Sequence, residues 1–157
     1  MLQRRQSLFL LIAIMVIGFS FLLPVARYTQ GDAMYRFTLL GLTTAEGRLV
    51  ADAELNVPFG LLMGLLAVML VVIVLQFRDR PRQLRFVRFA YVFVLVIGAS
   101  LYITHNSIKA YLEQAAPVEA FTGGAALAPV LVLVLLFLAQ RGIRKDEELV
   151  RSVDRLR

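Results

Sequence analysis

The sequence contains no cysteine and a single histidine, His105. Without cysteine the chain forms no disulfide and offers no thiolate to a metal or an iron–sulfur cluster. One histidine excludes haem ligation by two histidines of the same chain, and no other zinc ligand lies beside it. We therefore expect no metal and no cofactor. We interpret His105 as an interfacial residue hydrogen-bonded near Asn106, with a ligand role inside a complex as the alternative.

Charged residues are also scarce, at 18% of the chain, and hydrophobic residues make up 59%. Ordinary soluble domains have about 25% charged residues. The apolar excess lies in four long runs, at about 7–26, 57–77, 86–104 and 121–139. Their only charged residue is Arg88, at the end of the third run, where it can snorkel. Such runs are typical of membrane spans, so we predict an all-α membrane fold, a four-transmembrane-helix bundle formed by residues 1–157 as one domain.

The orientation follows from the basic residues between the runs. Thirteen of the 17 lysines and arginines lie before the first run, at 78–88 and after the fourth run, and four lie in the other two connections. By the positive-inside rule, both termini are expected in the cytoplasm, with 27–56 and 105–120 outside. This placement argues against nucleic-acid binding. The second connection also supplies candidate contacts to anionic lipid: Arg78, Arg80, Arg82 and Arg85.

The first outer connection, 27–56, alternates apolar and polar residues on both sides of a turn region at 43–47. This pattern predicts a β-hairpin, which needs a surface to pack against because isolated hairpins are marginally stable. The second, 105–120, carries an apolar stripe at helical spacing that includes Ile108 and Leu112. We expect a short external amphipathic helix over 107–116, ended by Pro117. Together they would form a small outer cap.

Small residues suggest where helices approach one another. Gly60 and Gly64 form a Gly-x-x-x-Gly motif in the second run, and Gly98 lies in the third. Such residues let helix backbones come close, within one chain or between subunits. In the fourth run Pro129 predicts a bend near 125–126, because proline removes a helical hydrogen bond.

Catalytic patterns are missing. The runs lack the buried ionisable groups that proton-coupled transport needs. We find no Ser-His-Asp set, phosphate-cradling glycine loop or nucleophile elbow, and expect no catalytic residue. The acids of the outer connections match no calcium-loop spacing, although they leave an outer-face enzyme as an alternative: Asp32, Glu46, Asp52, Glu54, Glu113 and Glu119.

The tail, 143–157, is amphipathic. Its apolar residues share one helical face and are candidate partner-docking residues: Leu149, Val150, Val153 and Leu156. Acids mixed with the basic residues suit a protein surface better than a lipid one.

The start, Met-Leu-Gln-Arg at 1–4, and the tail from Lys145 resemble an uncharacterised bacterial family, domain of unknown function 4293. Its members are short four-span inner-membrane proteins that begin Met-x-Gln-Arg and end close to Asp-Glu-x-Leu-Val-x-Ser-x-Asp-Arg-Leu-Arg. The resemblance implies a bacterial inner-membrane location and carries no activity.

The preferred hypothesis is a non-catalytic accessory or scaffold subunit of a larger inner-membrane complex, with the bilayer and at least one protein as partners. One alternative is a transporter or lipid-handling protein whose pathway lies between protomers. The other is the outer-face enzyme.

Overall fold

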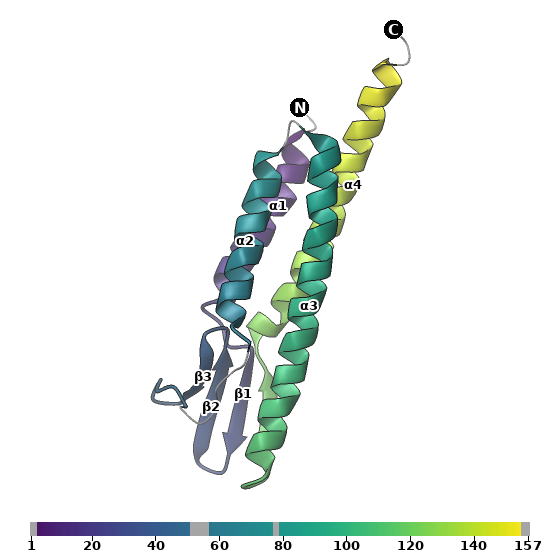
Figure 1. The fold of residues 1–157 in the computed structure, drawn as a ribbon. Coiled ribbons are helices and arrows are strands. Elements are labelled where there is room, and N and C mark those ends of the chain that lie inside the picture. Colours follow the sequence, from purple (N-terminus) through teal and green to yellow (C-terminus); the bar gives the residue numbers. More distant parts are fainter. Residues whose placement is uncertain (1–2, 51–56, 77–78, 155–157) are drawn as a thin grey trace.

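The computed structural model describes residues 3–50, 57–76 and 79–154. Their elements follow in the order α1 (Gln3–Ser20), β1 (Ala26–Gln30), β2 (Ala33–Thr38), β3 (Gly41–Thr44), α2 (Phe59–Leu75), α3 (Arg80–Glu113), β4 (Glu119–Thr122), the 3-10 helix η1 (Gly124–Leu127) and α4 (Ala128–Asp154). The four α-helices lie side by side, and we call them the helical part (Figure 1). Helix α1 contacts α2 and α4, and helix α3 contacts the same two helices, so the four helices form a closed ring.

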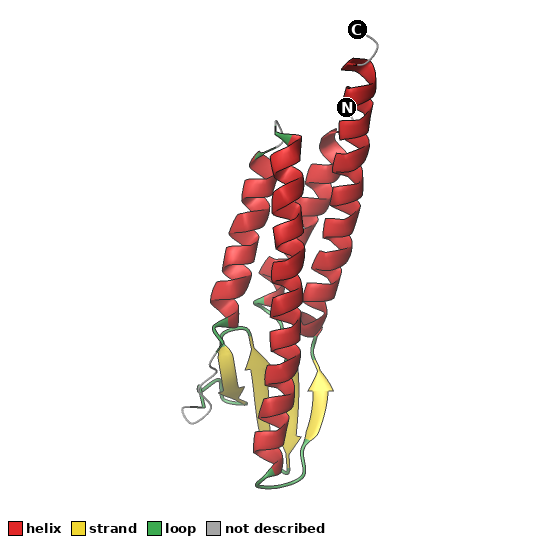
Figure 2. Ribbon diagram, turned by 45° about the vertical axis from the view of Figure 1, so that its right-hand side comes forward, coloured by secondary structure: helices red, strands yellow, loops and turns green. Residues whose placement is uncertain are grey.

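The sheet lies at one end of the helical part, which we call the sheet end, and both chain termini lie at the other, the terminal end (Figure 1). The strands are antiparallel, in the order β3-β2-β1-β4. Helix α3 runs on past the ends of its neighbours and lies along the sheet (Figure 2). Strand β4 comes from the connection between α3 and α4, so the sheet joins two distant parts of the chain.

The predicted all-α, four-transmembrane-helix fold was wrong. The chain forms a four-stranded sheet, and among the described residues only two helical segments, Pro81–Glu113 and Gly124–Lys145, are long and apolar enough to cross a membrane. The apolar stretches Gln6–Ser20 and Phe59–Leu75 are shorter. The first predicted span, 7–26, is helical only to Ser20, because Pro24 disfavours a helix and Ala26 already belongs to β1.

The external segment 27–56 is not a single hairpin. Strands β1, β2 and β3 form a meander, and residue pairs such as Arg27 with Arg36 set its register. The predicted second half contributes one isolated bridge, Thr43 with Leu49, and residues 51–56 lie outside the described part. Period-two alternation identified extended chain but did not identify its neighbours.

The separate external helix over 107–116 was also a wrong prediction. Helix α3 is 34 residues long and continues without a break to Glu113. At 1.5 Å per residue it extends about 50 Å, which exceeds the roughly 30 Å of a bilayer core. No proline or glycine interrupts the chain between Gly98 and Pro117, so nothing ends the helix earlier.

The fourth run begins differently from its prediction. Phe121 and Thr122 belong to β4, η1 follows, and α4 starts at Ala128. Pro129 therefore lies in the first turn of α4, where its missing N–H costs little, and the bend predicted within a helix is replaced by this turn before it. Helix α4 continues to Asp154, so the described part of the tail is its extension.

The helical part carries large apolar side chains on its exterior as well as in its interior. A buried stripe runs through all four helices, for example Leu10, Met63, Val94 and Leu136. Large apolar side chains are also exposed on every helix: Leu8, Leu11, Met15 and Phe19; Leu61, Leu65, Val68 and Leu75; Phe89, Val92, Leu95 and Val96; Val130, Leu131, Val134 and Phe137. Helices of a water-soluble protein keep a polar outer face, so this exterior suits a hydrocarbon solvent.

Candidate functional site: the junction of helix α3 with the sheet

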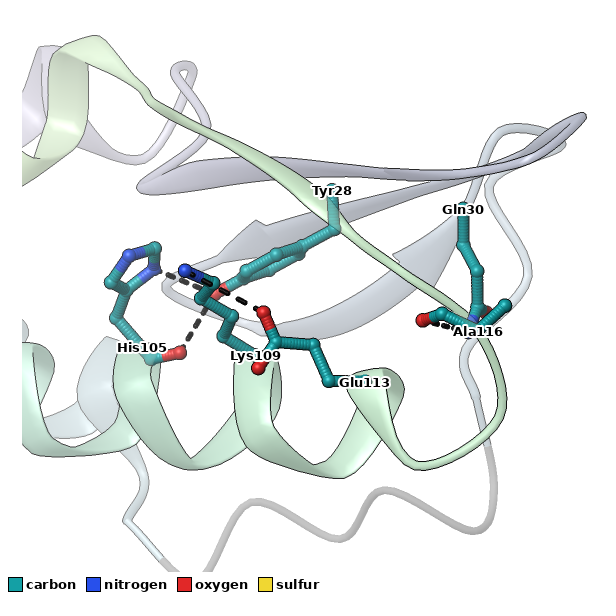
Figure 3. A network of polar contacts seen from close by, with 6 residues as sticks. All are labelled: Tyr28, Gln30, His105, Lys109, Glu113 and Ala116. Carbon is teal, nitrogen blue, oxygen red and sulfur yellow. Dashed lines mark hydrogen bonds and ion pairs between the residues drawn. The ribbon is translucent and has the colours of Figure 1, made fainter.

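Two side chains of β1 attach the sheet to α3 (Figure 3). The Tyr28 hydroxyl lies 2.7 Å from Nδ1 of His105 and 3.3 Å from the His105 carbonyl oxygen. The Gln30 amide donates to the carbonyl oxygens of Leu112, at 2.7 Å, and Ala116, at 3.3 Å. The Leu112 carbonyl also accepts from the Ala115 N–H at 3.2 Å, so Gln30 adds a side-chain hydrogen bond to the turn that ends α3.

Tyr28 and His105 are joined by a hydrogen bond and by stacking of their rings. The Tyr28 side chain is fully buried, its ring stacks on the imidazole at 5.5 Å, and burial raises the pKa of its hydroxyl. The hydroxyl therefore stays neutral and carries one proton. One arrangement uses both contacts: Nδ1–H donates to the hydroxyl oxygen and the hydroxyl donates to the His105 carbonyl. That arrangement leaves Nε2 as the acceptor nitrogen of the ring.

The sequence predicted His105 as a hydrogen-bonded residue near Asn106, and its partner is Tyr28 instead. The two residues are 77 positions apart. The signal available was that Tyr28 and Gln30 alternate with Arg27 and Thr29, which places them on one face of a strand. Nothing in the sequence showed that this face packs on the end of α3.

A groove between α3 and α4 opens beside His105. Its volume is about 530 Å³, and its lining includes Val94, Val130 and Leu133 from the apolar parts of the two helices. His105, Asn106 and Thr122 add polar atoms from the end of the groove near the sheet. The groove is therefore apolar along the helices and polar at the junction.

The predicted packing glycines occupy three different surroundings. A Cβ on Gly98 would lie 3.4 Å from Pro129, so this residue lies against α4. Gly60 lies against the β2–β3 turn, where its N–H donates to the Leu39 carbonyl at 2.8 Å and a Cβ would lie 3.0 Å from Leu40. Gly64 has open space beside its Cα.

The outer acids that the structure describes do not gather. Glu46 pairs with Arg48 at 3.5 Å and Glu113 with Lys109 at 3.6 Å. Asp32 and Glu119 are exposed, whereas Asp52 and Glu54 lie outside the described part. Within 3–50, 57–76 and 79–154, no three histidine or acidic side chains group as a metal site would need.

The terminal end carries the remaining predicted residues. Arg82 and Arg85 are exposed, and the Arg82 guanidinium pairs with the Asp79 carboxylate at 2.9 Å. The same carboxylate accepts from the Arg82 backbone N–H at 3.2 Å and so caps α3. The side chains of Arg78 and Arg80 lie outside the described part. Leu149, Val150 and Val153 belong to α4, with side chains that are not described, and Leu156 lies beyond the described residues.

The architecture defines a class: a protein with two helices of membrane-spanning length, packed with two shorter apolar helices and attached to a four-stranded antiparallel sheet. The chain belongs to the family described as Domain of unknown function (DUF4293), whose model matches residues 2–156. No curated protein matches the chain.

Proposed function

We propose that the protein is a non-catalytic accessory or scaffold subunit of a larger complex in the bacterial inner membrane. The observation that carries the proposal is the path of α4. This helix continues without a break from the helical part to Asp154 and projects beyond the ends of α1, α2 and α3 (Figure 1).

The direction of this projection favours a protein partner. Beyond Lys145, where the apolar segment ends, α4 extends for nine more residues, about 13 Å at the helical rise of 1.5 Å per residue. A helix that binds lipid through an apolar stripe lies in the plane of the interface. An extension that continues the axis of a spanning helix points away from the bilayer, where a protein can reach it.

The distribution of charge supports the orientation. Thirteen of the 17 lysines and arginines lie at positions 4–5, at 78–88 and beyond residue 140, and the described parts of these segments form the terminal end. The other four, Arg27, Arg36, Arg48 and Lys109, belong to the sheet end. Under the positive-inside rule the terminal end faces the cytoplasm and the sheet faces the periplasm. The extension of α4 would then meet its partner on the cytoplasmic side.

The test is co-purification from the native membrane in mild detergent. Leu149 and Val153 are changed together to serine, which removes about 1.5–3 kcal/mol for each side chain that the partner fully buries. We expect the partner to be lost while the protein stays in the membrane fraction. The control changes two exposed apolar residues of the sheet end, Met34 and Leu49, to serine. An unchanged set of co-purifying proteins in the Leu149/Val153 variant would refute the proposal.

The groove between α3 and α4 favours a second candidate, a lipid-handling protein. Its apolar walls and polar end match the two parts of a lipid molecule. If this candidate is right, the purified protein transfers a labelled phospholipid between vesicles, and Ala99→Leu, which narrows the groove at an exposed lining residue, slows the transfer. Failure of the wild-type protein to accelerate transfer would exclude it. An outer-face enzyme has weaker support, because the described acids of that end lie apart.

A further inference from the structure

Two arginines lie side by side on the face of the sheet that points away from α3. The register pairs Arg27 of β1 with Arg36 of β2, and it continues the row to Thr43 of β3 and Phe121 of β4. Both arginines are exposed, while their neighbours Tyr28 and Phe37 are buried on the opposite face. The row therefore presents two guanidinium groups and an exposed aromatic ring together.

This pairing is unfavourable by itself. Like charges directly opposite on neighbouring strands repel, since their Cβ atoms are only about 5 Å apart. Lys109 and Arg48, the other basic residues of the sheet end, are each paired with a carboxylate. Neither Arg27 nor Arg36 forms an ion pair with any residue of the described part of the chain. Two adjacent unpaired arginines gain most from a shared anion.

The row also lies near the helical part. Arg27 is the second residue of β1, directly after the junction where the Val25 carbonyl accepts from the Gly123 N–H at 2.8 Å. The same junction exposes Leu22, by 77% of its surface, and Leu40, by 74%. Phe121, in the row itself, is 59% exposed. Exposed apolar and aromatic side chains beside basic ones are typical of the level of lipid headgroups.

We propose that Arg27 and Arg36 form a binding site for the phosphate of an anionic phospholipid headgroup, with Phe121 and Leu40 resting in the interface beside it. The forked guanidinium groups bind phosphate oxygens with charge-assisted hydrogen bonds. This site requires that α3 and α4 cross the bilayer and is independent of any partner on α4. It would retain the sheet close to the membrane surface.

The experiment measures lipid binding to the full chain by native mass spectrometry, with phosphatidylglycerol and phosphatidylcholine as probes. Removing both charges in R27Q/R36Q should weaken phosphatidylglycerol binding about 30-fold, from roughly a fivefold loss for each basic residue. R48Q is the matched control, because Arg48 belongs to the same end but has its own carboxylate. R27K/R36K keeps the charges but loses the forked geometry, so its binding should fall between that of the wild type and that of R27Q/R36Q. Such intermediate binding separates a lost charge from a misfolded sheet.

A second measurement distinguishes the source of the phosphate. Titration of the protein with inorganic phosphate should show no saturable binding if the acyl chains contribute. Saturable binding that R27Q/R36Q abolishes would keep the anion site and assign it to a soluble phosphate. Equal phosphatidylglycerol binding by R27Q/R36Q and R48Q, or no preference of the wild type over phosphatidylcholine, would overturn the proposal.

Discussion

The Tyr28 hydroxyl lies 2.7 Å from Nδ1 of His105, and this contact joins the first strand to the third helix. It is a hydrogen bond between two side chains that the fold brings together from separate parts of the chain. The stability of the sheet against α3 should therefore respond to the loss of one oxygen atom.

Tyr28→Phe removes that oxygen and keeps the ring. We expect the free energy of unfolding to fall by about 1–3 kcal/mol, because His105 loses a partner in a partly buried place. The measurement is thermal unfolding in detergent, together with amide hydrogen exchange in β1. The matched control is Tyr35→Phe on β2, the cross-strand neighbour of Tyr28. Equal effects of the two substitutions would contradict the role of the hydrogen bond.

The same residue predicts a dependence of stability on pH. Burial raises the pKa of Tyr28 above its ordinary value of 10. A group whose pKa is raised in the folded state contributes stability that is complete below the unfolded pKa and is lost as the pH rises above it. The stability advantage of the wild type over Tyr28→Phe should therefore shrink above pH 10. The measurement is chemical denaturation of both proteins between about pH 8 and about pH 11, a range that brackets the ordinary tyrosine pKa. A difference in the free energy of unfolding between wild type and Tyr28→Phe that stays constant over this range would refute the prediction.

Gly123 lies between β4 and η1, where the chain passes the connection from α1 to β1. A Cβ there would collide with the carbonyl group of Pro24, which is backbone and cannot turn aside. Gly123→Ala should cost about 1–3 kcal/mol, the usual penalty for overpacking. Gly64→Ala is the control, because a Cβ there meets open space and helical alanine is about 1 kcal/mol better than glycine. Melting temperatures should move in opposite directions.

Gly98 sets the approach of α3 to α4. A methyl group fits at 3.4 Å from Pro129, so Gly98→Ala should be tolerated. Gly98→Leu should separate the helices and lower the free energy of unfolding by about 1–3 kcal/mol. Thermal unfolding of both variants measures the contrast. A stable leucine variant would show that the groove accommodates the larger side chain.

The orientation is testable with reporter fusions. Fusions after Arg157 should be active only with cytoplasmic reporters, and insertions between Gly41 and Gly47 only with periplasmic ones, given the distribution of basic residues. A periplasmic tail would refute the orientation. Replacing Arg82 and Arg85 by glutamine should leave the orientation unchanged, because other basic residues remain at that end.

The local sequence pattern was sufficient to predict four apolar helices, extended chain after the first of them, and the basic residues of the connections. These features are local, since hydrophobic runs and charge counts are read from consecutive residues. It also located extended chain at 35–38, which belongs to β2 (Ala33–Thr38), because alternation marks a strand whatever lies beside it. The family resemblance at the two ends is confirmed by the match over residues 2–156.

Which residues come into contact depends on the long-range contacts of the fold. Strand β4 was hidden at the start of an apolar run, and it becomes a strand because the edge of β1 needs a partner for its N–H and C=O groups. The spans were overestimated because hydrophobicity cannot distinguish Val25, which is buried directly before β1, from a residue that faces lipid. The prediction divided α3 into a span and a separate external helix. The structure shows one continuous helix, whose end is held against the sheet by Tyr28 and Gln30. Pairings of this kind depend on contacts between distant residues, which the local pattern of a single chain does not record.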